Sequence, residues 1–161
     1  MRALASTGRN RSAVPDSIRV STVISCHARS KTRRGAEWGE RMLDDAIAMY
    51  NDGDERVKPD VIMFNCAILG WTGISGVESE QQGSSSSNNG GDDIPAERAE
   101  MFLRRMARDS SRRYTGQASA ASTFAFNIVL DGWAKGMKGG AVYTALGLME
   151  EMPDHGAVPS A

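Results

Sequence analysis

One stretch of the chain occurs twice, and this internal repetition constrains the fold more than any other feature. In both copies a Phe-Asn pair is followed, five residues after the Asn, by Gly-Trp: Phe64-Asn65 with Gly70-Trp71, and Phe126-Asn127 with Gly132-Trp133. A weaker copy lies upstream at residues 15–27 and begins with Pro-Asp, as residues 59–71 do. Self-similarity of this kind indicates a repeat protein, in which one supersecondary unit recurs along the chain.

The repeated stretch has the spacing of an amphipathic helix. In each strong copy the apolar residues lie at i, i+3, i+4 and i+7: Phe64, Ala67, Ile68 and Trp71, then Phe126, Val129, Leu130 and Trp133. This spacing predicts one helix per copy, with those residues forming a buried stripe. The Asn beside each aromatic residue therefore points away from the stripe. Asp60, which follows Pro59, is predicted to cap the helix that begins after it.

A second segment with helical patterning follows each copy. We predict second helices over residues 36–51, from Pro95 onward and over residues 141–152, with Pro153 ending the last one. The apolar stripes expected on them are Trp38, Met42, Ala46 and Met49 or Tyr50; Ala99, Phe102, Leu103 and Met106; and Val142, Ala145, Met149 and Met152. No stretch shows the alternation expected of strands. The sequence therefore predicts an all-α fold, an alpha-alpha superhelix formed as a short solenoid of about three helical-hairpin repeats.

This patterning divides the chain into a basic N-terminal segment, residues 1–14, and three units at 15–60, 61–122 and 123–160. The second unit carries an insertion at 75–93 that is rich in Ser, Asn, Gly and acidic residues, and we expect it to be disordered. The basic segment has three Arg and no acidic residue, a composition that suits an organelle transit peptide and equally a truncated gene model. No polar capping repeat is visible, so the first and last helices are expected to expose apolar residues.

Composition excludes several classes of protein. The net charge is −1, although residues 1–41 hold nine Lys/Arg against three Asp/Glu. No apolar run approaches the ~18 residues that a membrane span needs, so no membrane partner is expected. The two cysteines are predicted to be reduced rather than paired. No Cys/His cluster has metal-ligand spacing, and the adjacent carboxylates lie side by side on helices rather than converging, so we expect neither a metal, nor a cofactor, nor an enzyme.

The third unit resembles a pentatricopeptide repeat (PPR), a unit of two antiparallel helices. The residues that carry the resemblance are the aromatic-Asn pair with its aliphatic continuation at 126–135, the second helix at 145–152 and the tail Gly-x-x-Pro-Ser at 156–160. The resemblance extends over residues 15–161 apart from the insertion. The first unit departs from it, because Val20-Ser21 stands in place of aromatic-Asn, and the three units differ in length.

The resemblance implies sequence-selective binding of single-stranded RNA, with one base read per repeat by two or three side chains. It assigns base reading to the polar residue after the aromatic position and to the last residue of the unit: Ser21 with Asp60, Asn65 with Ser122, and Asn127 with Ser160. It assigns stacking against base faces to Ile18, Ile62 and Phe124. The implied role is an adaptor in transcript processing, stability or translation in a mitochondrion or plastid.

Other interpretations remain open at this point. Helix-one Asn residues can be ordinary solvated side chains, and Phe124 can belong to the core. A tetratricopeptide-like scaffold of helical hairpins would bind protein partners instead of RNA, although its Trp-x-x-Leu-Gly-x-x-Tyr pattern is absent. The chain can also be the RNA-binding fragment of a larger RNA-processing enzyme.

Overall fold

The computed structural model describes residues 15–74, 95–109, 123–136 and 140–155. These ranges contain no strand; they form six α-helices and two short 3-10 helices: α1 (Ser17–Arg29), α2 (Arg33–Asn51), η2 (Glu55–Val57), α3 (Val61–Thr72), α4 (Pro95–Asp109), α5 (Thr123–Gly136), α6 (Ala141–Glu151) and η5 (Pro153–His155). The all-α prediction is therefore confirmed for the described part of the chain. The predictions for residues 1–14 and 75–93 lie outside the described residues.

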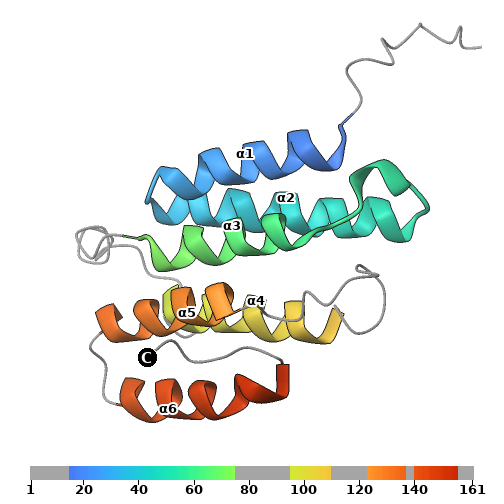
Figure 1. The fold of residues 1–161 in the computed structure, drawn as a ribbon. Coiled ribbons are helices and arrows are strands. Elements are labelled where there is room, and N and C mark those ends of the chain that lie inside the picture. Colours follow the sequence, from blue (N-terminus) through green and yellow to red (C-terminus); the bar gives the residue numbers. More distant parts are fainter. Residues whose placement is uncertain (1–14, 75–94, 110–122, 137–139, 156–161) are drawn as a thin grey trace, which may run out of the picture.

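The helices form three antiparallel hairpins, α1–α2, α3–α4 and α5–α6 (Figure 1). The first helices of the hairpins, α1, α3 and α5, run in one direction, and the second helices, α2, α4 and α6, run in the opposite direction. α3 packs against both α1 and α2, and α5 packs against both α3 and α4. Each hairpin is thus held to the one before it mainly through its first helix.

Matching caps begin the first two of these helices. Oδ1 of Asp16 accepts a hydrogen bond of 2.8 Å from the backbone N–H of Arg19, and Oδ1 of Asp60 accepts one of 2.8 Å from that of Met63. The cap predicted at Asp60 is therefore confirmed. The two caps align α1 with α3 residue by residue, so that Ile18 corresponds to Ile62.

The buried faces of the first helices agree with the predicted stripes. Phe64, Ala67, Ile68 and Trp71 are buried, and so are Phe126, Val129 and Trp133, while Leu130 is partly buried. The stripe predicted on α4 is also buried: Ala99, Phe102, Leu103 and Met106. These helices pack against neighbours on more than one side, which is why the apolar spacing and the buried face coincide.

The prediction for α2 was wrong in two respects. The helix begins at Arg33 rather than at Ala36, because Oγ1 of Thr32 accepts a 3.0 Å hydrogen bond from the N–H of Gly35 and caps the helix early. Trp38 of the predicted stripe is exposed, and of the two alternatives at its last position Tyr50 is partly buried against the core while Met49 is exposed. The face that is buried consists of Gly35, Ala36, Gly39, Leu43, Ala46 and Ile47.

The stripe predicted on α6 is likewise only partly buried. Met152 and Leu148 lie in the core, but Val142 and Met149 are 69% and 42% exposed. No described element covers this outer side of α6, so its apolar side chains remain in contact with solvent. Together with exposed Ile18 and Val23 on α1, they confirm that the first and last helices expose apolar residues. α6 ends at Glu151, just before Pro153, as predicted, and Pro153 begins the short helix η5.

The glycine of each Gly-Trp pair lies where helices approach closely. A Cβ atom at Gly70 would lie 3.5 Å from Cα of Ala36 and 3.6 Å from Cα of Ala28, so α3 crosses two neighbours at this point. A Cβ atom at Gly132 would lie only 2.7 Å from Cγ2 of Thr72. The Gly-Trp repetition in the sequence therefore reflects a recurrent close contact followed by a large buried anchor.

Candidate nucleic-acid interface on the first helices

Each first helix exposes a large apolar residue at the same place near its start, and these three are more than half exposed. Ile18 on α1 is 77% exposed, Ile62 on α3 is 59% exposed, and Phe124 on α5 is 55% exposed. All three occupy the second helical position of their helices. Since α3 packs against both α1 and α5, these residues recur along neighbouring helices. The alternative that Phe124 belongs to the core is wrong.

A polar residue follows each of these side chains three positions later, which is about one helical turn. Ser21 is partly exposed, Asn65 is partly exposed and Asn127 is exposed. The hydroxyl of Ser21 donates a 2.9 Å hydrogen bond to the backbone carbonyl of Ile18, and its lone pairs can still accept a hydrogen bond. Each first helix thus offers an apolar residue and a hydrogen-bonding residue at equivalent places.

Asn65 differs from Asn127 in one respect that bears on binding. Its amide oxygen is buried and makes no hydrogen bond within the described residues. An unpaired buried acceptor costs about 1–3 kcal/mol. A rotation that brings this oxygen to the surface, where it can accept a hydrogen bond from a ligand, would remove that cost.

The predicted unit-terminal residues are only partly described. Asp60 is partly buried, and one of its carboxylate oxygens is already bound to the N–H of Met63 in the helix cap. Ser122 and Ser160 lie outside the described residues. Of the predicted pairs, the structure therefore places both members only for Ser21 with Asp60.

The cysteines and two arginines were also located relative to this face. Burial raises the pKa of the Cys66 thiol, despite a hydrogen bond with Ser25, so this thiol stays neutral beside Asn65 at physiological pH. Both cysteines are free, as predicted. Arg33 and Arg34 begin α2 beyond the C-terminal end of α1, so they lie at the opposite end of the hairpin from Ile18.

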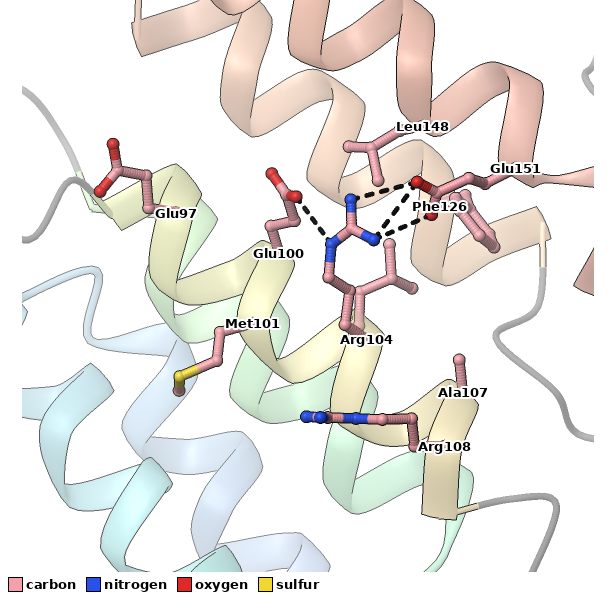
Figure 2. A pocket seen from close by; sticks show the side chains of 10 residues that line it. Glu97, Glu100, Met101, Arg104, Ala107, Arg108, Phe126, Leu148 and Glu151 are labelled. Atoms are coloured by element: carbon pink, nitrogen blue, oxygen red, sulfur yellow. Dashed lines mark hydrogen bonds and ion pairs between the residues drawn. The ribbon is translucent and has the colours of Figure 1, made fainter.

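A pocket of about 740 Å³ lies elsewhere, between α4, α5 and α6. Figure 2 shows Arg104 projecting between Glu100 and Glu151. Nε of Arg104 donates to Glu100 at 2.9 Å, and its Nη1 and Nη2 donate to the two oxygens of Glu151 at 3.1 and 3.2 Å. Because two carboxylates already neutralise this guanidinium, the pocket does not present a free cation at Arg104 for a phosphate.

The junctions between hairpins contain polar contacts that the sequence did not reveal. Nε1 of Trp71 donates to Oε2 of Glu40 at 3.1 Å, and Nη2 of Arg98 pairs with Oε1 of the same carboxylate at 3.1 Å. The Arg98 guanidinium also lies 5.6 Å from the centre of the Trp71 ring. At the next junction, Nε1 of Trp133 donates to Glu100 at 3.0 Å. Glu100 thus takes the place of Glu40.

The second helices are also linked across these junctions by ion pairs of opposite polarity. At the first junction Asp44 of α2 accepts from Arg105 of α4 at 2.6 Å. At the second, Arg104 of α4 donates to Glu151 of α6 at 3.1 Å. In the first pair the acidic residue, Asp44, lies on the earlier helix, and in the second pair the acidic residue, Glu151, lies on the later helix. Equivalent positions therefore carry opposite charges.

Comparison with known protein families, with curated proteins and with solved structures found no significant match. Among the described residues, no helix is long and apolar enough to cross a membrane. The same residues contain no group of three or more His, Cys, Asp or Glu side chains suited to hold a metal ion.

Proposed function

We propose that this chain is a PPR-type protein that binds single-stranded RNA along its first helices. The observation that supports this most is the exposure of Ile18, Ile62 and Phe124, one on each first helix, each followed one turn later by a polar side chain. Singly exposed apolar residues are common on protein surfaces, so it is the recurrence of these three at equivalent positions of neighbouring helices that favours a binding role.

The chemistry of the two positions suits single-stranded nucleic acid. An apolar or aromatic side chain can stack against any base, which contributes about 1–3 kcal/mol per base. The amide of Asn127 both donates and accepts, so it can pair with the Watson–Crick edge of a pyrimidine. Stacking would supply affinity, and the amide would supply base preference.

In this proposal the three hairpins form a short α-α superhelix. Repeated packing of each first helix on the preceding hairpin supports it, as does the recurrence of the Trp–Glu contact at both junctions. Stacked units of this kind present their first helices on one extended surface. In this proposal the protein acts as an adaptor for transcript processing, stability or translation in a mitochondrion or plastid, without catalysis of its own.

The test is a titration of the full chain with short single-stranded RNAs that differ at one base. Phe124→Ala should weaken binding by about tenfold, the scale of one lost base stack. Tyr143→Ala is the matched control, because Tyr143 is an exposed aromatic residue, 83% exposed, on the second helix α6. Asn127→Ala should reduce discrimination between bases while leaving the fold intact, because Asn127 is exposed.

If the parent binds RNA but Phe124→Ala and Tyr143→Ala behave alike, the first-helix surface is not the binding surface. If the parent binds no RNA even at low salt, RNA binding is rejected in favour of a protein-binding scaffold of helical hairpins.

A further inference from the structure

The junction between the first two hairpins shows which polar contacts join one hairpin to the next. Glu40 on α2 places one carboxylate oxygen on the Trp71 indole N–H and the other on Arg98. At this junction an acidic residue lies on one side and an aromatic–cation pair on the other. Asp44, one turn after Glu40, adds an ion pair with Arg105.

The residues at the same positions can be found on the outer side of the first hairpin, which is the side of α1 and α2 that faces away from the second hairpin. The caps at Asp16 and Asp60 align His27 of α1 with Trp71 of α3. The Trp–Glu bonds align Glu40 with Glu100, and this alignment places Trp38 of α2 at the position of Arg98. It also superposes buried residues of α2 on buried residues of α4: Ala36 on Ala96, Gly39 on Ala99, Leu43 on Leu103 and Ala46 on Met106.

The residues aligned with Trp71 and Arg98 also contact each other, here by ring stacking, and among the described residues no carboxylate takes the place that Glu40 has at the junction. The rings of His27 and Trp38 stack with their centres 6.3 Å apart and their planes 16° apart. The guanidinium of Arg41 lies 5.7 Å from the centre of the Trp38 ring. Trp38 remains 45% exposed and Val23 of α1 remains 40% exposed. Ala67, the residue of α3 that aligns with Val23, is buried.

We propose that this outer side of the first hairpin binds an amphipathic helix of a partner protein that carries an acidic residue one turn before a basic one. Its carboxylate would accept hydrogen bonds from the ring N–H groups of His27 and Trp38 and pair with Arg41. An apolar residue between its two charges would cover Val23. Its basic residue would face Asp45, which occupies the position of Arg105. This surface is distinct from the first-helix face of the proposed RNA binding, so the two proposals stand independently.

Charge excludes the most obvious alternative occupants. Glu151 of α6 pairs with Arg104 as Arg105 of α4 pairs with Asp44, so Glu151 takes the position of Arg105. A second copy stacking through its α6 would then bring Leu146 to the position of Glu100 and Glu150 to the position of Arg104, which places Glu150 against Asp45. Like charges at such a contact are unfavourable. Residues 1–14 contain no acidic residue and cannot supply the carboxylate.

The chain itself provides a probe, because α4 carries Glu100 and Arg104 in the required order. A dye-labelled peptide of residues 95–109, stapled as a helix on the face away from Glu100 and Arg104, is titrated into the full chain and followed by fluorescence anisotropy. The control peptide exchanges the two charges through Glu100→Lys and Arg104→Glu. We expect the native order to bind about tenfold more tightly, the scale of one charge-assisted hydrogen bond.

Three variants of the full chain locate the site. Trp38→Ala should lose this preference, whereas Tyr143→Ala, on the third hairpin, should keep it. Asp45→Lys should shift the preference toward a peptide carrying Arg104→Glu alone. A peptide that merely displaced the native α4 would bind Trp38→Ala as it binds the parent, and that result would overturn the proposal.

Two other results would also overturn it. One is equal or absent binding of the two peptides. The other is sedimentation showing head-to-tail oligomers of the parent, since a second copy would then be the occupant. Displacement of the peptide by a short single-stranded RNA from the parent, but not from Trp38→Ala, would assign the Trp38 surface to nucleotides instead.

Discussion

Nε1 of Trp71 donates a 3.1 Å hydrogen bond to Oε2 of Glu40, which joins the first helix of one hairpin to the second helix of the hairpin before it. Trp133 and Glu100 repeat this relationship at 3.0 Å. Both indoles are more than nine-tenths buried, and a buried indole N–H needs an acceptor. The carboxylate therefore allows a large apolar anchor to be buried at each junction without leaving its donor unpaired.

Loss of this acceptor should destabilise the fold. Glu40→Leu leaves the Trp71 N–H buried and removes the ion pair of Arg98, so we expect the free energy of unfolding to fall by about 1–3 kcal/mol. Urea denaturation followed by circular dichroism measures the change. Glu37→Leu is the control, because Glu37 lies on the same helix and its ion pair with Arg33 is exposed. Equal losses in the two variants would contradict the role of the junction.

Stability should also depend on pH through Glu40. Burial raises the pKa of its carboxyl above the ordinary value of 4.5, although the Arg98 guanidinium lowers it and Asp44 adds to the rise. The folded chain therefore holds this proton to higher pH than the unfolded chain does. The resulting contribution to stability is fully present below pH 4.5 and is lost as the pH rises through the folded pKa.

Glu40→Gln removes this titration while keeping an acceptor for the Trp71 N–H. We expect the unfolding free energy of the variant, relative to the parent, to increase between about pH 4 and about pH 7. Parallel urea titrations across that range measure the difference. A difference that stays constant or decreases would show that Glu40 is not destabilised by its burial.

The close contact at Gly132 gives a prediction about packing. Gly132→Ala places a methyl group 2.7 Å from Cγ2 of Thr72, whose hydroxyl is bound to the carbonyl of Ile68, so the methyl cannot turn aside freely. We expect a loss of about 1–3 kcal/mol from overpacking. Adding Thr72→Ser removes the Cγ2 atom and should restore part of it.

Gly147 provides the matched control for that substitution. A Cβ atom there would have nothing within 4 Å, and Gly147 lies inside α6. Gly147→Ala should therefore raise the unfolding free energy by about 0.5–1 kcal/mol through helix propensity. Similar destabilisation by both alanines would mean that the Thr72 contact does not decide the effect.

If the chain binds RNA, its two adjacent arginines should act through charge alone. Arg33 and Arg34 are exposed and lie on the first hairpin, whereas Asn127 lies on α5 of the third, so we expect the arginines to contact phosphates without reading bases. Arg34→Ser should weaken binding to all sequences and reduce the slope of log K against log salt by about 0.7. Asn127→Ala should leave that slope unchanged. A loss of base preference in Arg34→Ser would contradict the division of roles.

The sequence was sufficient for helices that are packed on several sides. Phe126, Val129 and Trp133 were predicted to be buried and are, because every apolar residue of α5 at that spacing finds a neighbour. It was insufficient for Trp38 and Val142, whose helices lie at the two ends of the stack. Periodicity shows that a helix has an apolar face, but it does not show whether another element covers that face.

The candidate RNA surface was easier to locate than the junctions. Ile18, Ile62 and Phe124 stand at one place in each repeat, and the resemblance to a pentatricopeptide repeat assigned that place before the structure showed it to be exposed. Glu40 and Arg98 could not be found in this way, since their importance depends on Trp71, which is distant from both in the sequence. Such pairings become visible only once the crossing of the helices is known.

The opposite polarity of the Asp44–Arg105 and Arg104–Glu151 pairs has a consequence for how such a chain can change by recombination. An unequal exchange that removed the middle unit would bring Asp44 of the first unit against Glu151 of the third. The two carboxylates would repel where each now has an arginine. The units are therefore not interchangeable modules. The charges on the second helices favour only the order in which the units now follow one another.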